Sequence, residues 1–340
     1  MTTSLLRAAI IGCGPFNETR GGCNSVGYAH AAAIRNTSGI SLVAAASRTP
    51  KNIADFCGEF PGTAGYTDYR EMLAAERPDW VSVCAFPPDR EAMCLAALEA
   101  GAKILLVEKP FAVTAAAMRS ILTAPESKGA RVFVNHQRRY GKWFEWFREQ
   151  VRTQACGELK ALTLYHGGLG FINFGPHLID AALFALEPRR PVSVQAAVDW
   201  TDAGDYQGVR TEKSILADIL FDDGVHLTLH SGPDAGKGQP CLRAACAGGL
   251  VELYFGPFGP TRAIGRVVGE RVTSPDFGTE HFHHNDTAPN VFYDRAVQDM
   301  VACYRNGTPC RVDARLATVG TAILLGAYES ARLGTPVALG

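Results

Sequence analysis

A lysine that follows an apolar segment is the first residue of this chain that could do chemistry. Residues 104–107 (Ile-Leu-Leu-Val) predict a buried parallel strand, and Glu108, Lys109 and Pro110 follow it directly. Open α/β sheets bind their ligands at the carboxyl ends of such strands. Pro110 favours extended geometry at Lys109, so the ammonium group is held in place and could donate to an alkoxide or a carbonyl oxygen. A surface strand that ends in an ordinary turn would explain the same residues.

A histidine in the second half of the chain could supply the acid or base. The ordinary histidine pKa of about 6.5 permits both proton states near neutral pH, which suits His177 to take up or release a proton. Asp180 follows three residues later, so both side chains would lie on one face of a helix. Asp180 could bind a substrate hydroxyl or orient the imidazole. The alternative is a histidine at a helix start and a surface acid.

Two glycines near the beginning of the chain could bind a phosphate. Gly12 and Gly14 end the first predicted strand and precede a helix, so backbone amides and the positive end of that helix could approach a pyrophosphate. A third glycine, Gly27, comes only after an insertion over residues 15–26 that contains Arg20. The insertion could place Arg20 on a phosphate or over the substrate, and a tolerated surface loop is the simpler interpretation.

The end of the second predicted strand indicates which dinucleotide would bind. An acidic residue at this point would hold the ribose hydroxyls of NAD(H), and the chain has none there. Ser47, Arg48 and Thr49 instead offer hydroxyls and a positive charge that suit a 2′-phosphate. The sequence therefore favours NADP(H) over NAD(H), although Arg48 could also stack on adenine.

The elements that must position these residues fall into two groups. Residues 1–134 alternate strand-like and helix-like segments, which predicts βαβ units and a Rossmann domain with a doubly wound parallel sheet. Residues 135–340 predict an α+β domain with a large open, mainly antiparallel sheet. One helix there is expected over 176–186, and a closing helix over 315–333 could pack back on the first domain. Loops are expected over 233–239 and 272–290.

Composition and charge exclude several classes of protein. The 340 residues are 47% hydrophobic and 20% charged, and the formal net charge of −1 argues against nucleic acid or an anionic membrane as the main partner. No apolar segment approaches the roughly 18 residues that span a bilayer, and the start of the chain leads into a strand, with no room for a signal peptide. The ten cysteines show no metal-like spacing, so reduced thiols and a cytoplasmic location are expected.

Together these motifs resemble the glucose-fructose oxidoreductase/inositol dehydrogenase/MocA (Gfo/Idh/MocA) family of sugar and cyclitol dehydrogenases. The similarity covers nearly the whole chain. It is carried by the early Gly-x-Gly, Glu108-Lys109-Pro110, Asn135-x-x-Arg138-Arg139-Tyr140, Gly175-Pro176-His177-Leu178-Ile179-Asp180 and Tyr328-Glu329-Ser330-Ala331-Arg332-Leu333-Gly334. The resemblance implies a nucleotide-binding domain, an open-sheet domain, a substrate held between them, and hydride transfer between nicotinamide and a carbon that bears a hydroxyl.

The resemblance also implies roles for individual residues. Lys109 would be the active-site lysine and His177 the acid/base histidine. The family usually has Asp four residues before that histidine, where this chain has Asn173. An amide could orient His177 or bind a hydroxyl, but it would not stabilise an imidazolium by charge. A second departure is Phe86-Pro87-Pro88-Asp89-Arg90-Glu91 in place of Thr-Pro-Asn-x-x-His, so the cofactor contacts there would differ in part.

The predicted sites combine these arguments. Cofactor binding is assigned to Gly12, Gly14, Ser47, Arg48, Thr49, Ala85, Glu108 and Lys109. Substrate binding is assigned to Asn135, Arg138, Asn173, His177 and Asp180, and Tyr165 and His166 are further candidates. One of Arg138 and Arg139 is expected to form a salt bridge at the domain junction. No metal is predicted, because His281, His283 and His284 lie within four residues and could not all reach one tetrahedral ion on regular structure.

Two other functions stay open at this point. The chain could oxidise a sugar only transiently, as some relatives do, so that a glycosidic bond eliminates. It could also be a non-catalytic dinucleotide-binding sensor on the same fold. The expected partners are a small-molecule substrate and further copies of the chain. Because an open sheet needs a cover, a homodimer or homotetramer through the second domain is expected, as in the relatives.

Overall fold

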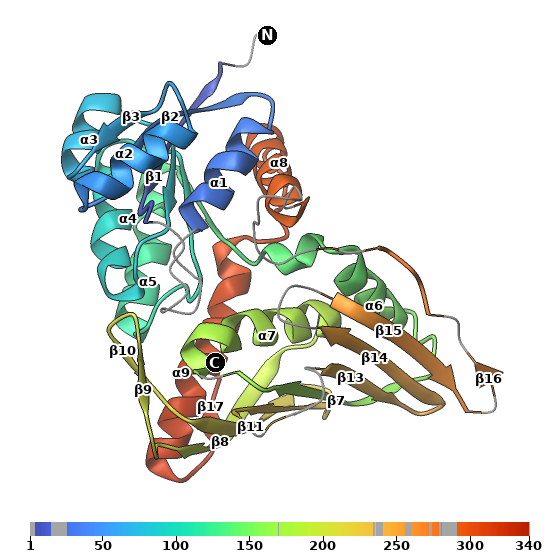
Figure 1. Ribbon diagram of the computed structural model, residues 1–340. Helices are drawn as coiled ribbons and strands as arrows, with labels where there is room; N and C mark the ends of the chain where they lie inside the picture. Colours follow the sequence, from blue (N-terminus) through green and yellow to red (C-terminus); the bar gives the residue numbers. More distant parts are fainter. Residues whose placement is uncertain are drawn as a thin grey trace. The chain divides into compact units, whose positions relative to one another are not determined.

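The computed structural model describes residues 4–14, 26–168, 170–233, 235, 241–255, 260–268, 270–271, 274–278, 280 and 291–339. The chain divides into two units (Figure 1). The first comprises Met1–Gln137 with His283–Ala317, and the second comprises Arg138–Phe282 with Thr318–Gly340.

Six short strands build the sheet of the first unit. They are β1 (Leu6–Ile11), β2 (Ile40–Ala46), β3 (Ala64–Tyr66), β4 (Trp80–Val83), β5 (Ile104–Val107) and β6 (Arg131–Val134). All pair in parallel, in the order β3-β2-β1-β4-β5-β6. This is the strand order of dinucleotide-binding sheets. From β1 the chain adds β2 and β3 on one side and then β4, β5 and β6 on the other, so the order of the strands reverses between β1 and β4. The predicted doubly wound parallel sheet is therefore confirmed.

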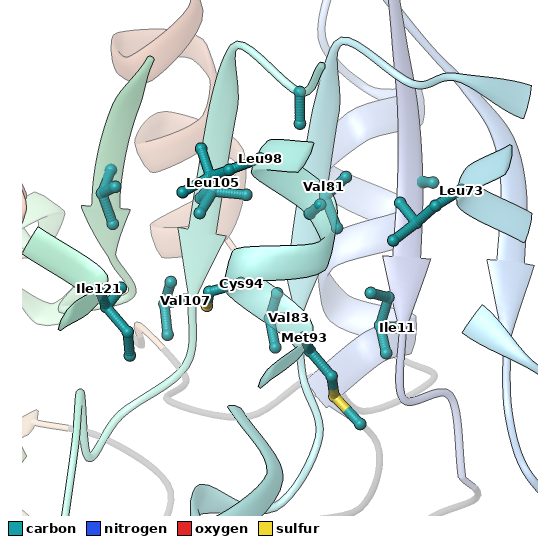
Figure 2. Packing of buried hydrophobic residues seen from close by; sticks show 14 of the residues in the cluster. Ile11, Leu73, Val81, Val83, Met93, Cys94, Leu98, Leu105, Val107 and Ile121 are labelled. Atoms are coloured by element: carbon teal, nitrogen blue, oxygen red, sulfur yellow. The ribbon is translucent and has the colours of Figure 1, made fainter. Parts of the chain in front are cut away.

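Helices cover the sheet and bury its apolar strands. They are α1 (Val26–Arg35), α2 (Pro50–Glu59), α3 (Tyr69–Glu76), α4 (Arg90–Glu99) and α5 (Ala115–Thr123), with the 3₁₀ turns η3 (Pro87–Asp89) and η4 (Glu126–Lys128). On one face, Leu73, Leu98 and Ile121 of three successive helices pack over the strand residues Val81 and Leu105 (Figure 2). Burial on both faces explains why these strands are continuously apolar in sequence.

A segment far along the chain also belongs to the first unit. Helix α8 (Val291–Asn306) packs against α1 (Figure 1), and Asn36 Nδ2 donates to Asp294 Oδ2 over 3.2 Å. The loop after α8 pairs with β6, because Val134 N donates to the Val312 carbonyl at 2.9 Å. The described residues 291–317, which the sequence prediction places in the second domain, thus belong to the first unit and reach its parallel sheet through Val312.

The second unit is built on a nine-stranded sheet. In spatial order its strands are β16 (Glu270–Arg271), β15 (Pro260–Val267), β14 (Gly249–Phe255), β13 (Cys241–Cys246), β7 (Leu159–His166), β12 (His226–Ser231), β11 (Ser214–Phe221), β8 (Pro191–Asp199) and β17 (Val337–Ala338). Only β7 and β12 pair in parallel among these described strands. Strands β9 (Gly204–Tyr206) and β10 (Val209–Thr211) form a separate hairpin. The predicted mainly antiparallel open sheet is confirmed.

Helices of the second unit cover one face of this sheet. Helices α6 (Lys142–Arg152) and α7 (Phe171–Leu186) lie over it (Figure 1), preceded by the 3₁₀ turn η5 (Gln137–Tyr140). Helix α9 (Ala314–Leu333) closes the chain before β17. Within the described ranges, no helix is both long enough and apolar enough to cross a membrane.

Helix α7 begins earlier than the sequence predicts. The prediction started at Pro176, whereas the helix starts at Phe171 and contains the proline. Pro176 removes one internal hydrogen bond. The buried carboxylate of Glu212 accepts from the Phe171 amide and so stabilises the start of the helix. Asn173 is therefore a helical residue.

Candidate functional site

The predicted cofactor-binding residues of the first unit gather at one edge of its sheet. Gly12 follows β1, Ser47 follows β2, Ala85 lies just past β4, and Glu108 and Lys109 follow β5. Because these strands are parallel neighbours, their carboxyl ends share one edge. Asn135, which was predicted to bind substrate, follows β6 at the same edge. This is the edge at which doubly wound sheets bind nucleotides.

Close backbone contacts shape the glycine loop. Gly12 has φ of +95°, and a Cβ on it would lie 2.8 Å from the Ala85 nitrogen. A Cβ on Gly27 would lie 2.6 Å from the Gly12 carbonyl oxygen. The displaced third glycine thus brings α1 directly against the end of β1, as the third glycine of a dinucleotide-binding loop does.

Cys13 faces the interior of the first unit. Its side chain is fully buried, and its thiol donates to the Ala46 carbonyl over 3.6 Å. Burial raises the pKa of the Cys13 thiol to about 12, so it stays protonated. The Gly12 amide donates to the same carbonyl at 2.9 Å, so the loop is joined to β2 at two points.

The end of β2 presents polar side chains at the surface. Ser47 is half-buried, and Arg48 and Thr49 are exposed. Arg48 Nη2 lies 3.9 Å from Asp89 Oδ2 in η3. Thr49 occupies the N-cap position of α2, but its hydroxyl makes no capping hydrogen bond there. The three predicted residues are thus placed where a ligand at this edge could reach them.

Glu108 is part of a buried polar cluster. Its Oε1 lies 2.9 Å from His30 Nε2 and also accepts from the Asn135 side-chain amide. His30 is fully buried, and Glu108 and Asn135 are nearly so. Burial alone raises the pKa of Glu108, but the hydrogen bond and charge of His30, with Lys109 and Asn135, more than offset it, and the pKa is lowered. Glu108 therefore stays ionised and orients its neighbours.

The backbone around Lys109 is held from two sides. The Lys109 amide donates to Glu108 Oε2 at 3.2 Å. Arg90 donates to the carbonyl oxygens of Ala85, at 2.9 Å, Lys109, at 3.2 Å, and Pro110. Lys109 itself is 9% exposed. The buried guanidinium of Arg90 thereby ties the end of β4 to the end of β5.

In the second unit, α7 carries the predicted acid/base residue. Asn173 and His177 are four residues apart on this helix, so they share one face. Both are buried, at 7% and 8% exposure. An amide four residues before the imidazole is the arrangement that the sequence predicted, here on regular helical structure.

A polar network not predicted from the sequence anchors the start of α7. The buried carboxylate of Glu212 accepts from the Phe171 amide, from Tyr328 Oη at 2.7 Å and from Thr211 Oγ1 at 3.2 Å. Burial, followed by the charge of Glu212, raises the pKa of Tyr328 well above its ordinary range, so the phenol remains a donor. This network joins the helix to β10 and α9 within the second unit.

Asp180 is occupied by an ion pair. Arg139 Nε donates to Asp180 Oδ1 at 2.9 Å, and Arg139 Nη1 donates to Glu187 Oε1 at 2.7 Å. Arg139 and Asp180 are 2% and 3% exposed. Burial lowers the pKa of Arg139, but the two carboxylates outweigh it, and the pKa is raised. The salt bridge that the sequence predicts for one of the two adjacent arginines is thus formed by Arg139 with Asp180, whose carboxylate fixes α7 to η5.

His166, at the end of β7, is a neutral imidazole at pH 7. Burial and then the charge of Arg138 lower its pKa to about 4. Its Nδ1 accepts from the Gly168 amide at 2.9 Å, and its ring centroid lies 4.5 Å from that of Phe174. His166, Arg138 and the first turns of α7 therefore lie close together in the second unit.

Two predicted features lie outside the described residues. They are the insertion with Arg20 and the segment with His281, His283 and His284. Four other residues hold the described site residues in place, and the sequence assigned them no role: His30, Arg90, Glu212 and Tyr328. Arg90 and Tyr328 lay in motifs that the sequence had marked, whereas His30 and Glu212 lay in none.

Comparisons with known proteins agree with this arrangement. Residues 6–136 match the family model described as "Oxidoreductase family, NAD-binding Rossmann fold". The predicted resemblance to the Gfo/Idh/MocA family is thereby confirmed, and the match covers the sheet edge described above. The chain is 27% identical to D-glucoside 3-dehydrogenase of Escherichia coli (strain K12) over 63% of its own length and 61% of that protein.

A second relative matches a shorter part of the chain. Inositol 2-dehydrogenase/D-chiro-inositol 3-dehydrogenase of Halalkalibacterium halodurans is 39% identical over 94 residues, which is 27% of each chain. The chain thus spans under two thirds of the length of these curated relatives.

Solved structures share the fold over nearly the full length. An oxidoreductase from Agrobacterium radiobacter in complex with NAD+, L-tartaric acid and magnesium has a TM-score of 0.81 at 16% identity, with 98% of each chain covered. Myo-inositol 2-dehydrogenase from Lactobacillus plantarum has a TM-score of 0.73 at 21% identity, with 98% of this chain and 99% of that chain covered. At these identities the likeness concerns the fold.

Proposed function

We propose that this protein is an NAD(P)-dependent dehydrogenase that transfers a hydride between nicotinamide and a secondary alcohol or ketone of a sugar, a cyclitol or a related polyol. The observation that carries the proposal is the position of Lys109. It follows β5 at the nucleotide-binding edge, inside the segment that matches an NAD-binding family, and Arg90 and Glu108 hold its backbone. The relatives named as glucoside and inositol dehydrogenases support the substrate class.

The residues at the sheet edge suit a dinucleotide. Gly12 adopts a left-handed backbone that admits no side chain, and a Cβ on Gly14 would meet only Asn52 Nδ2, at 3.5 Å, among the described residues. Backbone amides of this loop, with the first turn of α1, would bind the pyrophosphate. Bound nicotinamide would accept or supply the hydride. Ala85 and Glu108 would line the neighbouring part of the site.

Ser47, Arg48 and Thr49 favour NADP(H) over NAD(H) in this proposal. The ion pair between Arg48 and Asp89 is exposed and long, so solvent screens it and a 2′-phosphate would compete for the guanidinium. The neighbouring hydroxyls of Ser47 and Thr49 would add donors to the same phosphate.

The acid–base work in this proposal falls to His177, Asn173 and Lys109. His177 would take the hydroxyl proton during oxidation and return it during reduction, a task worth about 10²- to 10⁴-fold in rate. Asn173, on the same face of α7, would orient a hydroxyl or the imidazole. Lys109 would donate to the substrate oxygen as negative charge develops on it.

Other predicted residues would position these groups. Asn135 binds Glu108 directly, so we propose that it supports the end of β5 beside the substrate. Arg138 would bind a polar group of the substrate. Asp180 would position α7 through its ion pair with Arg139 and would not contact the substrate.

The chain would act as an oligomer in the cytoplasm. A homodimer or homotetramer through the open sheet stays the prediction. Helices α6 and α7 cover one face of that sheet, and a partner subunit would cover the other. Light scattering at several protein concentrations would test it.

Cofactor binding and turnover test the function. NADPH should raise the melting temperature more than NADH does at equal concentration, because the stabilisation of the folded state grows with the ratio of ligand concentration to Kd. Arg48→Ala should remove the difference while leaving the effect of NADH, with exposed Lys51→Ala as the control. A panel of sugars and inositols should then show absorbance change at the nicotinamide band. Binding of neither nucleotide would contradict the proposal.

A further inference from the structure

A group of metal-ligating side chains lies apart from the nucleotide-binding edge. Asp299 and Cys303 are four residues apart on α8, and Cys310 comes from the loop between α8 and α9. Both thiols are buried, at 5% and 4% exposure, and Asp299 is half-buried. The sequence shows no metal-like spacing here, because the fold and not a short motif brings the third residue to the helix.

The distances within this group fit a tetrahedral ion. One ligand atom from each side chain lies within 4.8 Å of the other two. Cys303 Sγ lies 3.4 Å from Asp299 Oδ1, and Cys310 Sγ lies 3.4 Å from Asp299 Oδ2. Zinc bonds of about 2.3 Å to sulfur and about 2.0–2.2 Å to oxygen place neighbouring ligands roughly 3.5 Å apart in a tetrahedron. Small shifts of the three side chains would therefore bring their ligand atoms to bonding distance of one ion.

Hydrogen bonds that do not involve the three ligand side chains hold the backbone that carries them. Arg131 Nη1 donates to the carbonyl oxygens of Cys303, at 3.0 Å, and Thr308, at 2.9 Å, while Nη2 lies 3.5 Å from Asp313 Oδ2. The Thr308 amide also donates to the Cys303 carbonyl at 3.0 Å. A site whose framework is fixed in advance loses little conformational freedom when an ion binds.

We propose that Asp299, Cys303 and Cys310 form a binding site for a soft divalent cation, with Zn²⁺ as the natural probe. Thiolate ligands select such ions over Mg²⁺ and Ca²⁺. Each thiol loses its proton to the solvent on binding, and the carboxylate of Asp299 supplies the third ligand. The Pro309 carbonyl oxygen, 3.1 Å from Cys303 Sγ, or a water molecule completes the coordination.

The simpler interpretation is two buried thiols that donate to a carboxylate. It explains the same distances, and it differs from a cation site in what it predicts for added metal. The proposal does not depend on the redox function, since it concerns α8 and the loop that follows it.

Cobalt titration distinguishes the two interpretations. Reduced, EDTA-treated full-length protein titrated with Co²⁺ should develop sulfur-to-metal charge-transfer absorption and the intense visible bands of tetrahedral cobalt, at one equivalent, and Zn²⁺ should abolish both. Cys303→Ser and Cys310→Ser should each lose the charge-transfer signal by half or more. Cys57→Ser, on α2, is the matched control and should keep it.

Asp299→Asn keeps the shape of the side chain, so it tests the site even if the cysteine variants misfold. It should weaken Co²⁺ binding at least tenfold while the melting temperature without metal stays close to that of the parent protein. Zn²⁺ should raise the melting temperature of the parent protein and not that of Cys310→Ser. No stoichiometric cobalt spectrum, or one that survives Cys303→Ser and Cys310→Ser, would overturn the proposal.

Discussion

His30 and Glu108, 78 residues apart in sequence, form a buried pair with Nε2 and Oε1 separated by 2.9 Å. His30 belongs to α1 and Glu108 follows β5, so the pair joins the helix of the glycine loop to the strand that precedes Lys109. The second oxygen of Glu108 accepts from the Lys109 amide. One carboxylate thus connects the two sequence motifs from which a dinucleotide site was predicted.

The first prediction concerns this pair. His30→Leu leaves the ionised carboxylate of Glu108 buried with one partner fewer, so it should lower the free energy of unfolding by about 3–5 kcal/mol, as for other broken buried pairs. Urea denaturation measures the change. Lys51→Ala, which breaks the exposed pair with Asp55, should cost at most about 1 kcal/mol. Equal effects of the two substitutions would contradict the role given to His30.

The second prediction concerns Lys109. Lys109→Met removes the donor to the substrate oxygen and should lower kcat/KM by about 10²-fold or more, with the Kd for NADPH changed much less. Lys103→Met is the control: Lys103 pairs with Asp79 at 2.7 Å near the start of β5, away from the binding edge, and should keep full activity. Steady-state kinetics with nucleotide binding by fluorescence would show the split, and an unchanged kcat/KM would remove Lys109 from the reaction.

Much of the first unit could be predicted because its signals are local. Apolar segments such as 104–107 end in polar residues, and that pattern predicts β5 and places Lys109 just after its carboxyl end. The partners of these residues are not local. Glu212 caps α7 from 41 residues further along the chain, so the sequence placed the helix start at Pro176 instead of Phe171. His30 gave no signal either, because a histidine on an apolar helix face is usual in a core.

The third prediction follows from the cap of α7. Tyr328→Phe removes a hydrogen bond to the buried carboxylate of Glu212, a change worth about 1.5–3 kcal/mol. Since that carboxylate anchors the helix of Asn173 and His177, kcat should fall while binding of NADPH is unchanged. Stopped-flow turnover and isothermal titration would separate the two effects. A variant that is less stable but has the parent kcat would show that Tyr328 serves stability alone.

The fourth prediction uses pH. The pKa of His166 is about 4 in the folded protein and about 6.5 when exposed, so below pH 6.5 the unfolded chain binds a proton that the folded one excludes. The stability linked to His166 is therefore complete above pH 6.5 and declines as the pH falls towards 4. His166→Gln should flatten this part of the profile, measured by urea denaturation at several pH values. His226→Gln, an exposed histidine, is the control, and an unaltered slope in His166→Gln would refute the assignment.

The contact of Gly27 with the Gly12 carbonyl has a consequence for protein engineering. It fixes the start of α1 against the end of β1, so the two ends of the segment that joins them are held close together. A shorter or longer connection grafted between Gly14 and Val26 should therefore leave β1, α1 and the position of Gly12 intact.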